Sequence, residues 1–311
     1  MAALLSCNSR PVGPSLGMTQ PTATIALYPE GQNVDAGIVE NGVTVTLGPA
    51  ESNQIDTVEF FWEADGSLNN VSDSARIELY LPEQRNGVMI VVCPGGGYSE
   101  LTYRGEGLFA ARLLTQKGYS VALLCYRMPA GHHVIPLTDV QNAFRYCRHH
   151  AQEWGIRKIG VLGGSAGGHL AASASTLYVD EVTRPDFTVL FYPAISAAGG
   201  MKSSTIRRLT GGDRDLMDYY SLENRVTTDT PPAILFHSTD DHTTDPENSM
   251  RYYKALRASG VHAEMYCFPQ GGHGWAFSTH ETAGKDKLGD YRAISSELLY
   301  RFLDSQKDWE D

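Results

Sequence analysis

The chain has 311 residues, of which 42% are hydrophobic and 20% charged, the composition of an ordinary globular enzyme with enough apolar residues for one large core. Its net charge of −11 at pH 7 repels phosphate backbones, and Lys and Arg form no basic stripe, so nucleic acid is excluded as an expected partner. No run of about 18 apolar residues occurs, and no membrane span is predicted.

The first 74 residues predict a tail followed by a few short strands. Residues 1–23 are expected to form a flexible tail, because a Pro/Gly/Ser-rich stretch cannot bury a core. Its Leu-Leu-Ser-Cys sequence, ending at Cys7, is similar to the end of a bacterial lipoprotein signal, but a basic n-region and an apolar h-region are missing. The compartment therefore stays open between the cytoplasm and a periplasmic lipoprotein. Strands are expected at 24–28, 43–47 and 57–62, as antiparallel edge strands or an N-terminal extension (24–74) of the main domain.

From about Ala75, short β-rich runs alternate with longer amphipathic segments, which is typical of βαβ units and a mostly parallel sheet with helices on both faces. The pattern predicts one domain over 24–311, without internal repeats. Strands are expected at 76–81, 88–93, 120–125, 158–162, 187–191, 233–237 and 262–268. Helices are expected at 107–117, 137–153, 166–177, 246–259 and 293–305.

Two further features of the sequence mark helix ends and an irregular segment. Gly118, Gly155 and Gly260 each follow a helical run, where a left-handed residue commonly ends a helix. Between residues 194 and 230 the periodicity weakens into Gly, Ser and charged residues with one short helical stretch at 214–220. Because it follows a central strand, this segment is expected to be a short cap-like insertion over a site.

The strongest chemical signal is the sequence Gly-Gly-Ser-Ala-Gly at 163–167, between an apolar strand and a helical run. In this setting Gly-x-Ser-x-Gly forms a strained turn that exposes the Ser165 hydroxyl above the sheet. A phosphate-binding loop is the alternative, but neither Gly-x-x-x-x-Gly-Lys-Ser/Thr nor Gly-x-Gly-x-x-Gly fits the spacing. Ser165 is therefore predicted to be a nucleophile.

A second glycine-rich loop, Pro-Gly-Gly-Gly-Tyr at 94–98, directly follows the predicted strand 88–93. Ester cleavage needs two amide donors about 3 Å from the forming oxyanion, and a loop without side chains can supply one of them. Gly96 or Gly97 is expected to give one amide, and Ala166, after the nucleophile, the other. A flexible turn is the plainer alternative.

The C-terminal half supplies an acid and a base. Asp241 follows the predicted strand 233–237, and His273 lies in a later Gly-Gly-His-Gly sequence, so the chain order is Ser, Asp, His. His273 is expected to be the general base and Asp241 to hold its tautomer. Asp240 is a rival for the acid, whereas His169 and His237 are expected to have structural roles.

Neither a metal nor a cofactor is expected. The acidic run at 240–247 is explained by a triad Asp followed by an acid-rich helix N-terminus, and His-Glu-x-x-His is absent. Without a Cys-x-x-Cys pair, the four cysteines beyond Cys7 are expected to be reduced core residues, at positions Cys93, Cys125, Cys147 and Cys267.

Together these segments resemble the bacterial acetylxylan and feruloyl esterases called BD-FAE-like, within the α/β-hydrolase superfamily. The resemblance runs from about Ala75 to the C-terminus, through 91–98, 163–170, 184–187, 247–249 and 271–274. It implies the α/β-hydrolase fold and the same three residues as catalytic triad. In the family, the loop that carries the acid usually reads Asp-x-x-Val-Pro. This chain departs from that pattern, because Thr244 and Asp245 occupy the last two positions.

By that resemblance the substrate is a small-molecule or oligosaccharide ester, and acetyl or feruloyl groups on plant polysaccharides are the implied targets. Tyr98, Tyr103 and Trp275 flank the motif loops and are expected to stack on a sugar or acyl group. Two alternatives remain: a prolyl-oligopeptidase-type serine peptidase, and a hydrolase-fold binding protein without catalysis. About 75 upstream residues are too few for the propeller that such peptidases carry, and a binding protein usually lacks the Ser or the His. The oligomeric state is left open.

Overall fold

The computed structural model describes residues 20–28, 38–40, 43–45, 59–62, 64–69, 71 and 75–307. Cys7 and most of the predicted tail lie outside the described residues. The described part is built around one eight-stranded sheet with the order β1-β6-β8-β7-β9-β10-β11-β12. The strands of this sheet are β1 (Ala23–Ala26), β6 (Arg76–Tyr80), β7 (Val88–Cys93), β8 (Ser120–Cys125), β9 (Lys158–Gly164), β10 (Thr188–Phe191), β11 (Ala233–Ser238) and β12 (Ala263–Phe268).

The sheet is mostly parallel, as predicted: β8, β7, β9, β10, β11 and β12 run in one direction, and β6 runs antiparallel to both of its neighbours, β8 and β1. Strands β7, β8 and β11 are buried along their whole length, which explains their continuous apolar sequences, because helices cover both faces of a parallel sheet. The predicted bounds of β7 and β8 are correct, and those of the other strands of this sheet are correct to within two residues.

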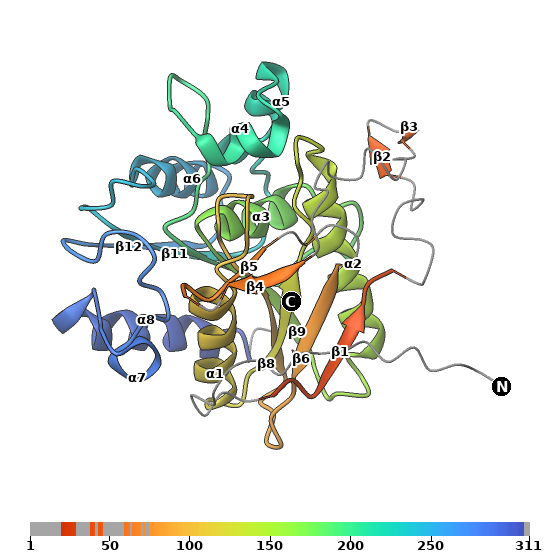
Figure 1. The fold of residues 1–311 in the computed structure, drawn as a ribbon, viewed down its shortest axis with the longest axis vertical. Helices are drawn as coiled ribbons and strands as arrows, with labels where there is room; N and C mark the ends of the chain where they lie inside the picture. Colours follow the sequence, from red (N-terminus) through yellow and green to blue (C-terminus); the bar gives the residue numbers. More distant parts are fainter. Residues whose placement is uncertain are drawn as a thin grey trace.

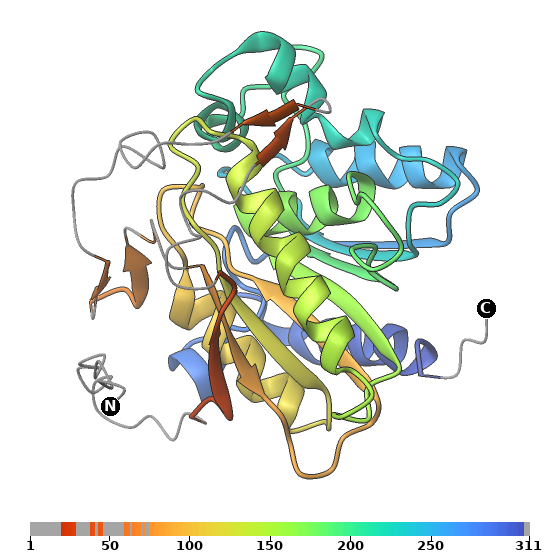
Figure 2. The ribbon, with the colours of Figure 1, turned by 90° about the vertical axis from the view of Figure 1, so that its right-hand side faces the viewer.

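Helices cover both faces of this sheet (Figures 1 and 2). Helices α2, α3 and α6 lie on one face, and α1 and α8 lie on the other (Figure 2). The helices are α1 (Phe109–Thr115), α2 (Val134–His150), α3 (Ser165–Thr176), α4 (Ser204–Thr210), α5 (Arg214–Tyr219), α6 (Glu247–Ala258), α7 (His280–Ala283) and α8 (Arg292–Ser305).

The segment 194–230, expected as a cap-like insertion, contains α4, α5 and the 3-10 turn η2 (Leu222–Asn224). Both views place α4 and α5 at one end of the molecule, beyond α3 and α6 (Figures 1 and 2). Helix α4 was not predicted, because its seven residues contain only two apolar side chains, Ile206 and Leu209, too few to show a helical period. Ser203 nevertheless caps it by accepting a hydrogen bond from the Ile206 amide.

Several details differ from the expectations. A π-helix, η1 (Tyr103–Leu108), precedes α1, which begins two residues later than predicted. Two small hairpins pair β2 (Ile38–Glu40) with β3 (Val43–Val45), and β4 (Phe60–Trp62) with β5 (Ser67–Asn69). Only one strand of each hairpin, β3 and β4, was predicted. The expectation of a buried Cys267 was wrong: it is exposed, because β12 is the edge strand of the sheet. The other three described cysteines are buried free thiols, as expected.

Three predicted helix ends are confirmed: Gly118, Gly155 and Gly260 all have positive φ.

A buried ion pair connects the segment that follows the N-terminal strand β1 to the rest of the domain. Arg127 and Asp139 lie 2.7 Å apart, and the Tyr28 hydroxyl, two residues after β1, donates to the same carboxylate.

Candidate active site

Strand register determines where the site forms. Cys93, the last residue of β7, is paired with Gly163 of β9, and Phe191, the last residue of β10, is paired with Gly164. The segments that follow these strands therefore leave the sheet side by side at its carboxyl edge. Ligand and catalytic residues of open α/β sheets gather at this edge.

Ser165 lies at the junction of β9 and α3 with a φ of +54°, a strained conformation for a residue with a side chain. The surrounding glycines make the turn possible. A Cβ on Gly163 would lie 2.1 Å from the Gly167 carbonyl oxygen, and a Cβ on Gly167 would lie 2.0 Å from the Cys93 carbonyl oxygen. The sharp turn leaves the Ser165 side chain partly exposed while Ala166 is fully buried.

The structure brings Ser165, His273 and Asp241 together from three distant parts of the chain. Ser165 Oγ lies 2.9 Å from His273 Nε2, and His273 Nδ1 lies 2.7 Å from Asp241 Oδ2. A carboxylate only accepts hydrogen bonds, so Nδ1 carries the proton and Nε2 is free to accept from the serine hydroxyl. This is the geometry of a serine nucleophile with its base and its orienting acid.

Asp241 is held as an anion. Burial alone would raise its pKa, but hydrogen bonds from His237 and His273 and from the Thr244 amide hold the pKa of this carboxyl well below its usual value. The neighbouring Asp240 is exposed and instead accepts the Gly272 amide at 2.8 Å. Of the two candidate acids, only Asp241 contacts the His273 ring.

The glycine-rich loop after β7 borders the nucleophile. Gly96 has a φ of +120°, and a Cβ there would lie 2.0 Å from the Glu100 carbonyl oxygen, so only glycine fits this position. The Tyr126 hydroxyl fixes the loop by donating to the Pro94 carbonyl at 2.7 Å. Within the described residues, the amides of Gly96, Gly97 and Ala166 donate to no acceptor. They are therefore available to bind an oxyanion, which an oxyanion donor must be.

Two of the three aromatic residues expected to bind substrate cannot do so. Trp275 is fully buried and packs edge-on against Phe191 and Phe268, so no ligand reaches its ring. The Tyr103 hydroxyl donates to Glu78 at 2.6 Å and its ring packs on Phe61. Both corrections have one cause: sequence position near a loop does not reveal the direction of a side chain.

Tyr98 is nearly buried, and its hydroxyl contacts His169 Nδ1 at 3.0 Å. It also lines a cavity of about 510 Å³ with Ala130, Gly131 and residues of α4, among them Arg207 and Arg208. The Arg208 guanidinium donates to the carbonyl of Gly97, so this cavity borders the glycine-rich loop.

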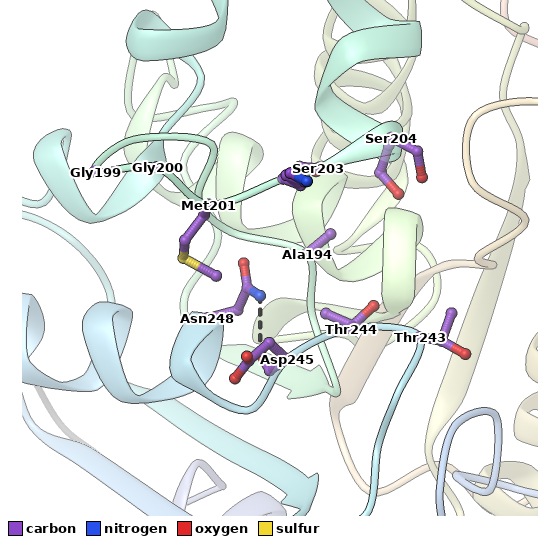
Figure 3. Close-up of a pocket in the computed structure, with 12 residues that line it drawn as sticks. Ala194, Gly199, Gly200, Met201, Ser203, Ser204, Thr243, Thr244, Asp245 and Asn248 are labelled. Carbon is purple, nitrogen blue, oxygen red and sulfur yellow. Dashed lines mark hydrogen bonds between the residues drawn. The ribbon is translucent and has the colours of Figure 1, made fainter.

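A second cavity, of about 410 Å³, lies beside the acid loop (Figure 3). Its walls are the segment 199–205 after β10, and Thr243, Thr244, Asp245 and Asn248 before and at the start of α6. Figure 3 shows the Asn248 side chain and Met201 facing each other across it, with Asn248 Nδ2 bonded to the Asp245 carbonyl. The cavity touches the site on two sides, since the Thr244 amide binds Asp241 and the Ala194 amide binds the Ser165 carbonyl. Ser204 of α4 lines both cavities.

The other histidines near the motifs are structural, as expected. His169 is fully buried, and burial lowers its pKa to about 4 despite a hydrogen bond to the Tyr220 carbonyl. His237 is also buried and contacts Ser249 Oγ, the Thr244 carbonyl and Asp241.

Two residues beside the triad were missed. Glu106 of η1 is a buried carboxylate that accepts the Gly95 amide, and Tyr192 lies directly after β10 with its ring 4.6 Å from that of His273. The position of Tyr192 after a parallel strand was an available signal. No comparable signal marked Glu106, because it reaches the site through tertiary packing.

Among the described residues, no cluster of three or more His, Cys, Asp or Glu could hold a metal ion. In the same part of the chain, no helix has the length and apolar character needed to cross a membrane.

Comparison with known proteins agrees with this architecture. Residues 77–185 match the BD-FAE family model, and residues 132–291, about half of the chain, match the prolyl oligopeptidase family. Acetylxylan esterase from Xylanibacter ruminicola is 38% identical over 68% of this chain and 46% of the esterase. Endo-1,4-beta-xylanase B from Butyrivibrio fibrisolvens is 30% identical over 65% of this chain and 34% of the xylanase. The chain thus matches less than half the length of either relative.

A solved structure extends the similarity over almost the whole chain. The acetyl ester-xyloside bifunctional hydrolase from Caldicellulosiruptor lactoaceticus superposes with a TM-score of 0.70 and 28% identity, covering 93% of this chain and 98% of the hydrolase. The chain therefore belongs to the α/β-hydrolase superfamily and, by residues 132–291, to the prolyl oligopeptidase family; its residues 77–185 are similar to the BD-FAE family.

Proposed function

We propose that this protein is a serine carboxylesterase that removes O-acetyl or other O-acyl groups from carbohydrate through an acyl-enzyme intermediate. The observation that carries the proposal is the continuous hydrogen-bond chain from Ser165 through His273 to Asp241 beside a loop with unused amide donors.

In the first half of the reaction, Ser165 Oγ attacks the ester carbonyl carbon while its proton passes to His273 Nε2. The carbonyl oxygen becomes an anion and accepts hydrogen bonds from the amides of Gly96 and Ala166. The bond to the alcohol then breaks, and His273 Nε2 gives its proton to the leaving oxygen. The acyl group stays on Ser165 as an ester.

In the second half, a water molecule replaces the alcohol. His273 takes one of its protons, the hydroxide attacks the acyl carbon, and Ser165 recovers its proton as the carboxylic acid leaves. Asp241 stays ionised through both halves, since its pKa is held low, and stabilises the imidazolium each time it forms.

Two features support a carbohydrate as the alcohol part. The cavity beside the acid loop has Ser, Thr, Asn, Asp and Lys side chains that can hydrogen-bond hydroxyl groups. Independently, the similar proteins are named acetylxylan esterase and acetyl ester-xyloside hydrolase.

The proposal is tested by measuring acetate and ferulate released from acetylated and feruloylated xylo-oligosaccharides. We expect release of the acid by the wild type and none above background by Ser165→Ala. The panel should include short peptides, because residues 132–291 match the prolyl oligopeptidase family. Peptide cleavage without ester cleavage would make the protein a serine peptidase and overturn the proposal.

A further inference from the structure

A buried carboxylate that takes no direct part in the mechanism lies behind the nucleophile. Glu106 is only 6% exposed, and no Lys or Arg of the described residues pairs with it. A Cβ on Gly164 would lie 2.8 Å from its carboxyl carbon, so the carboxylate packs directly against the residue before Ser165. Burying an acid without a cation is unfavourable, and such a group requires an explanation.

Both oxygens of Glu106 accept hydrogen bonds, from two different walls of the site. Oε2 accepts the Gly95 amide at 2.6 Å, and Oε1 accepts the Tyr192 hydroxyl at 2.9 Å. The Tyr192 oxygen in turn accepts the Ala276 amide at 3.1 Å. A chain of hydrogen bonds therefore runs from the loop of oxyanion donors to the segment that carries His273.

Tyr192 is constrained in its own right. It has a φ of +37°, is fully buried, and its ring lies 4.6 Å from the His273 ring, tilted by 54°. The hydroxyl is fixed at the other end by Glu106. The His273 imidazole therefore packs against the Tyr192 ring, and the hydrogen bond to Glu106 fixes the position of that ring.

The donors around Glu106 match the ionised form, because each oxygen receives a hydrogen and neither faces an acceptor. The pKa of Glu106 lies above its usual value, because burial raises it more than the Gly95 amide, the charge of His273 and the Tyr192 hydroxyl lower it.

We propose that Glu106 is a positioning residue for this reaction: its carboxylate fixes the oxyanion loop through Gly95 and the base through Tyr192. The inference rests on the proposed hydrolase function, not on any particular acyl group. Because Gly96 follows Gly95, a shift of the Gly95 amide displaces the next donor directly. Misplacement of about 1 Å in a catalytic group can reduce a rate about 100-fold.

Glu78 provides a matched control. It is 7% exposed and accepts the hydroxyls of Tyr103 at 2.6 Å and Tyr80 at 3.1 Å, so it is also a buried carboxylate bound by tyrosine. It lies on β6 and contacts none of the triad residues. If buried carboxylates matter here only for folding, Glu78→Gln and Glu106→Gln should have the same effect on activity.

The experiment measures kcat and KM for p-nitrophenyl acetate with the wild type, Glu106→Gln and Glu78→Gln. In Glu106→Gln, the oxygen of the new side-chain amide can still accept the Gly95 amide, but the Tyr192 hydroxyl hydrogen is left without an acceptor. We expect Glu106→Gln to lower kcat about 10- to 100-fold with little change in KM. Glu78→Gln should keep the wild-type kcat and KM.

Equal losses in both variants, or a folded Glu106→Gln with wild-type kcat, would overturn the inference. If Glu106→Gln does not fold, Tyr192→Phe removes the hydroxyl alone; a wild-type kcat in that variant would also overturn it. The rate of Ser165 labelling by a fluorophosphonate probe separates this inference from the proposed function. A wild type that labels rapidly but cleaves no ester contradicts the esterase proposal, while slower labelling of Glu106→Gln still supports the role of Glu106.

Discussion

Asp241 uses both of its oxygens, and each has a separate task. Oδ1 accepts the amides of Thr243 and Thr244 at 2.8 and 2.9 Å, which fixes the carboxylate in the loop after β11. Oδ2 is directed at His273 and lies 3.4 Å from His237. The loop therefore presents one oxygen directly to the His273 ring, the proposed base.

This arrangement predicts a sharp difference between two adjacent acids. Asp241→Asn should lower kcat about 10³-fold or more, because an amide in place of Oδ2 can force His273 into the wrong tautomer. Asp240→Asn keeps an oxygen that can accept the Gly272 amide and should change kcat little. Steady-state kinetics on p-nitrophenyl acetate decide the matter, and a greater loss in Asp240→Asn would contradict the assignment.

For single residues, the sequence predicted the position of a side chain where a short motif determines the local backbone conformation. Ser165 and the glycines around it could be placed because the turn has a recognisable sequence, and His273 and Asp241 because of their chain order. Side-chain direction could not be predicted: Trp275 points into the core and Tyr103 toward Glu78. Glu106 comes after β7 and Tyr192 comes after β10. The two residues meet because β7, β9 and β10 are neighbours that end at the same edge of the sheet.

At the scale of elements, the junction of β9 and α3 is the tightest part of the site. Helix α3 approaches the end of β7 so closely that Gly167 faces the carbonyls of Cys93 and Pro94 at distances that exclude a Cβ. The nucleophile and the oxyanion loop are thereby held by backbone contact between a helix and a strand. Such contact is more rigid than a contact between side chains.

We therefore expect Gly167→Ala to move the loop after β7. The added methyl would lie 2.0 Å from the Cys93 oxygen, and overpacking of this kind lowers the free energy of unfolding by about 1–3 kcal/mol. kcat should fall together with stability, because the displaced backbone carries the oxyanion donors. Urea unfolding and kinetics measure both effects.

Gly105→Ala is the matched control, because its Cβ would meet only the Thr102 methyl, at 3.2 Å. A Gly167→Ala variant as stable and active as Gly105→Ala would contradict the close contact.

The elements themselves were predictable to different degrees. Strands β7 and β8 were predicted with correct bounds, since β7 is an apolar run between Gly87 and Pro94 and β8 is an apolar run that begins two residues after Gly118. Helix α4 and the π-helix η1 were not, because the first has only two apolar residues, Ile206 and Leu209, and the second is a local widening that no periodicity marks. Strand β5 is polar and is held by its pairing with β4 and by a bridge from Leu68 to Leu101.

At the scale of the whole molecule, the fold buries groups whose protonation would oppose folding. His169, on α3 beneath the site, is fully buried between the Tyr98 hydroxyl and the Tyr220 carbonyl. A carbonyl only accepts, so Nε2 carries the proton and Nδ1 accepts from Tyr98. This neutral imidazole joins the glycine-rich loop to the end of α5. A second proton would take away the acceptor of the Tyr98 hydroxyl and leave a charge buried at this position.

The pH dependence of stability follows from this burial. In the folded chain the pKa of His169 is about 4, against an ordinary value of 6.5, so between these pH values the unfolded chain binds the proton more readily. Stability should fall as the pH falls through this window, by about 2 kcal/mol between pH 7 and pH 5 from this residue. Urea unfolding of the wild type and His169→Gln at both pH values measures the contribution. An equal loss in the two proteins would contradict it.

In the proposed mechanism, the Ser165 hydroxyl, activated by His273, is the nucleophile that carries the acyl group. The most direct test is to quench the reaction with p-nitrophenyl acetate in acid during turnover and to locate the acetyl group by peptide mass spectrometry. We predict acetylation of the peptide that contains Ser165, and in Ser165→Ala no acetylated peptide and a rate at least about 10³-fold lower. Acetyl on a different residue, or wild-type turnover by Ser165→Ala, would contradict the account.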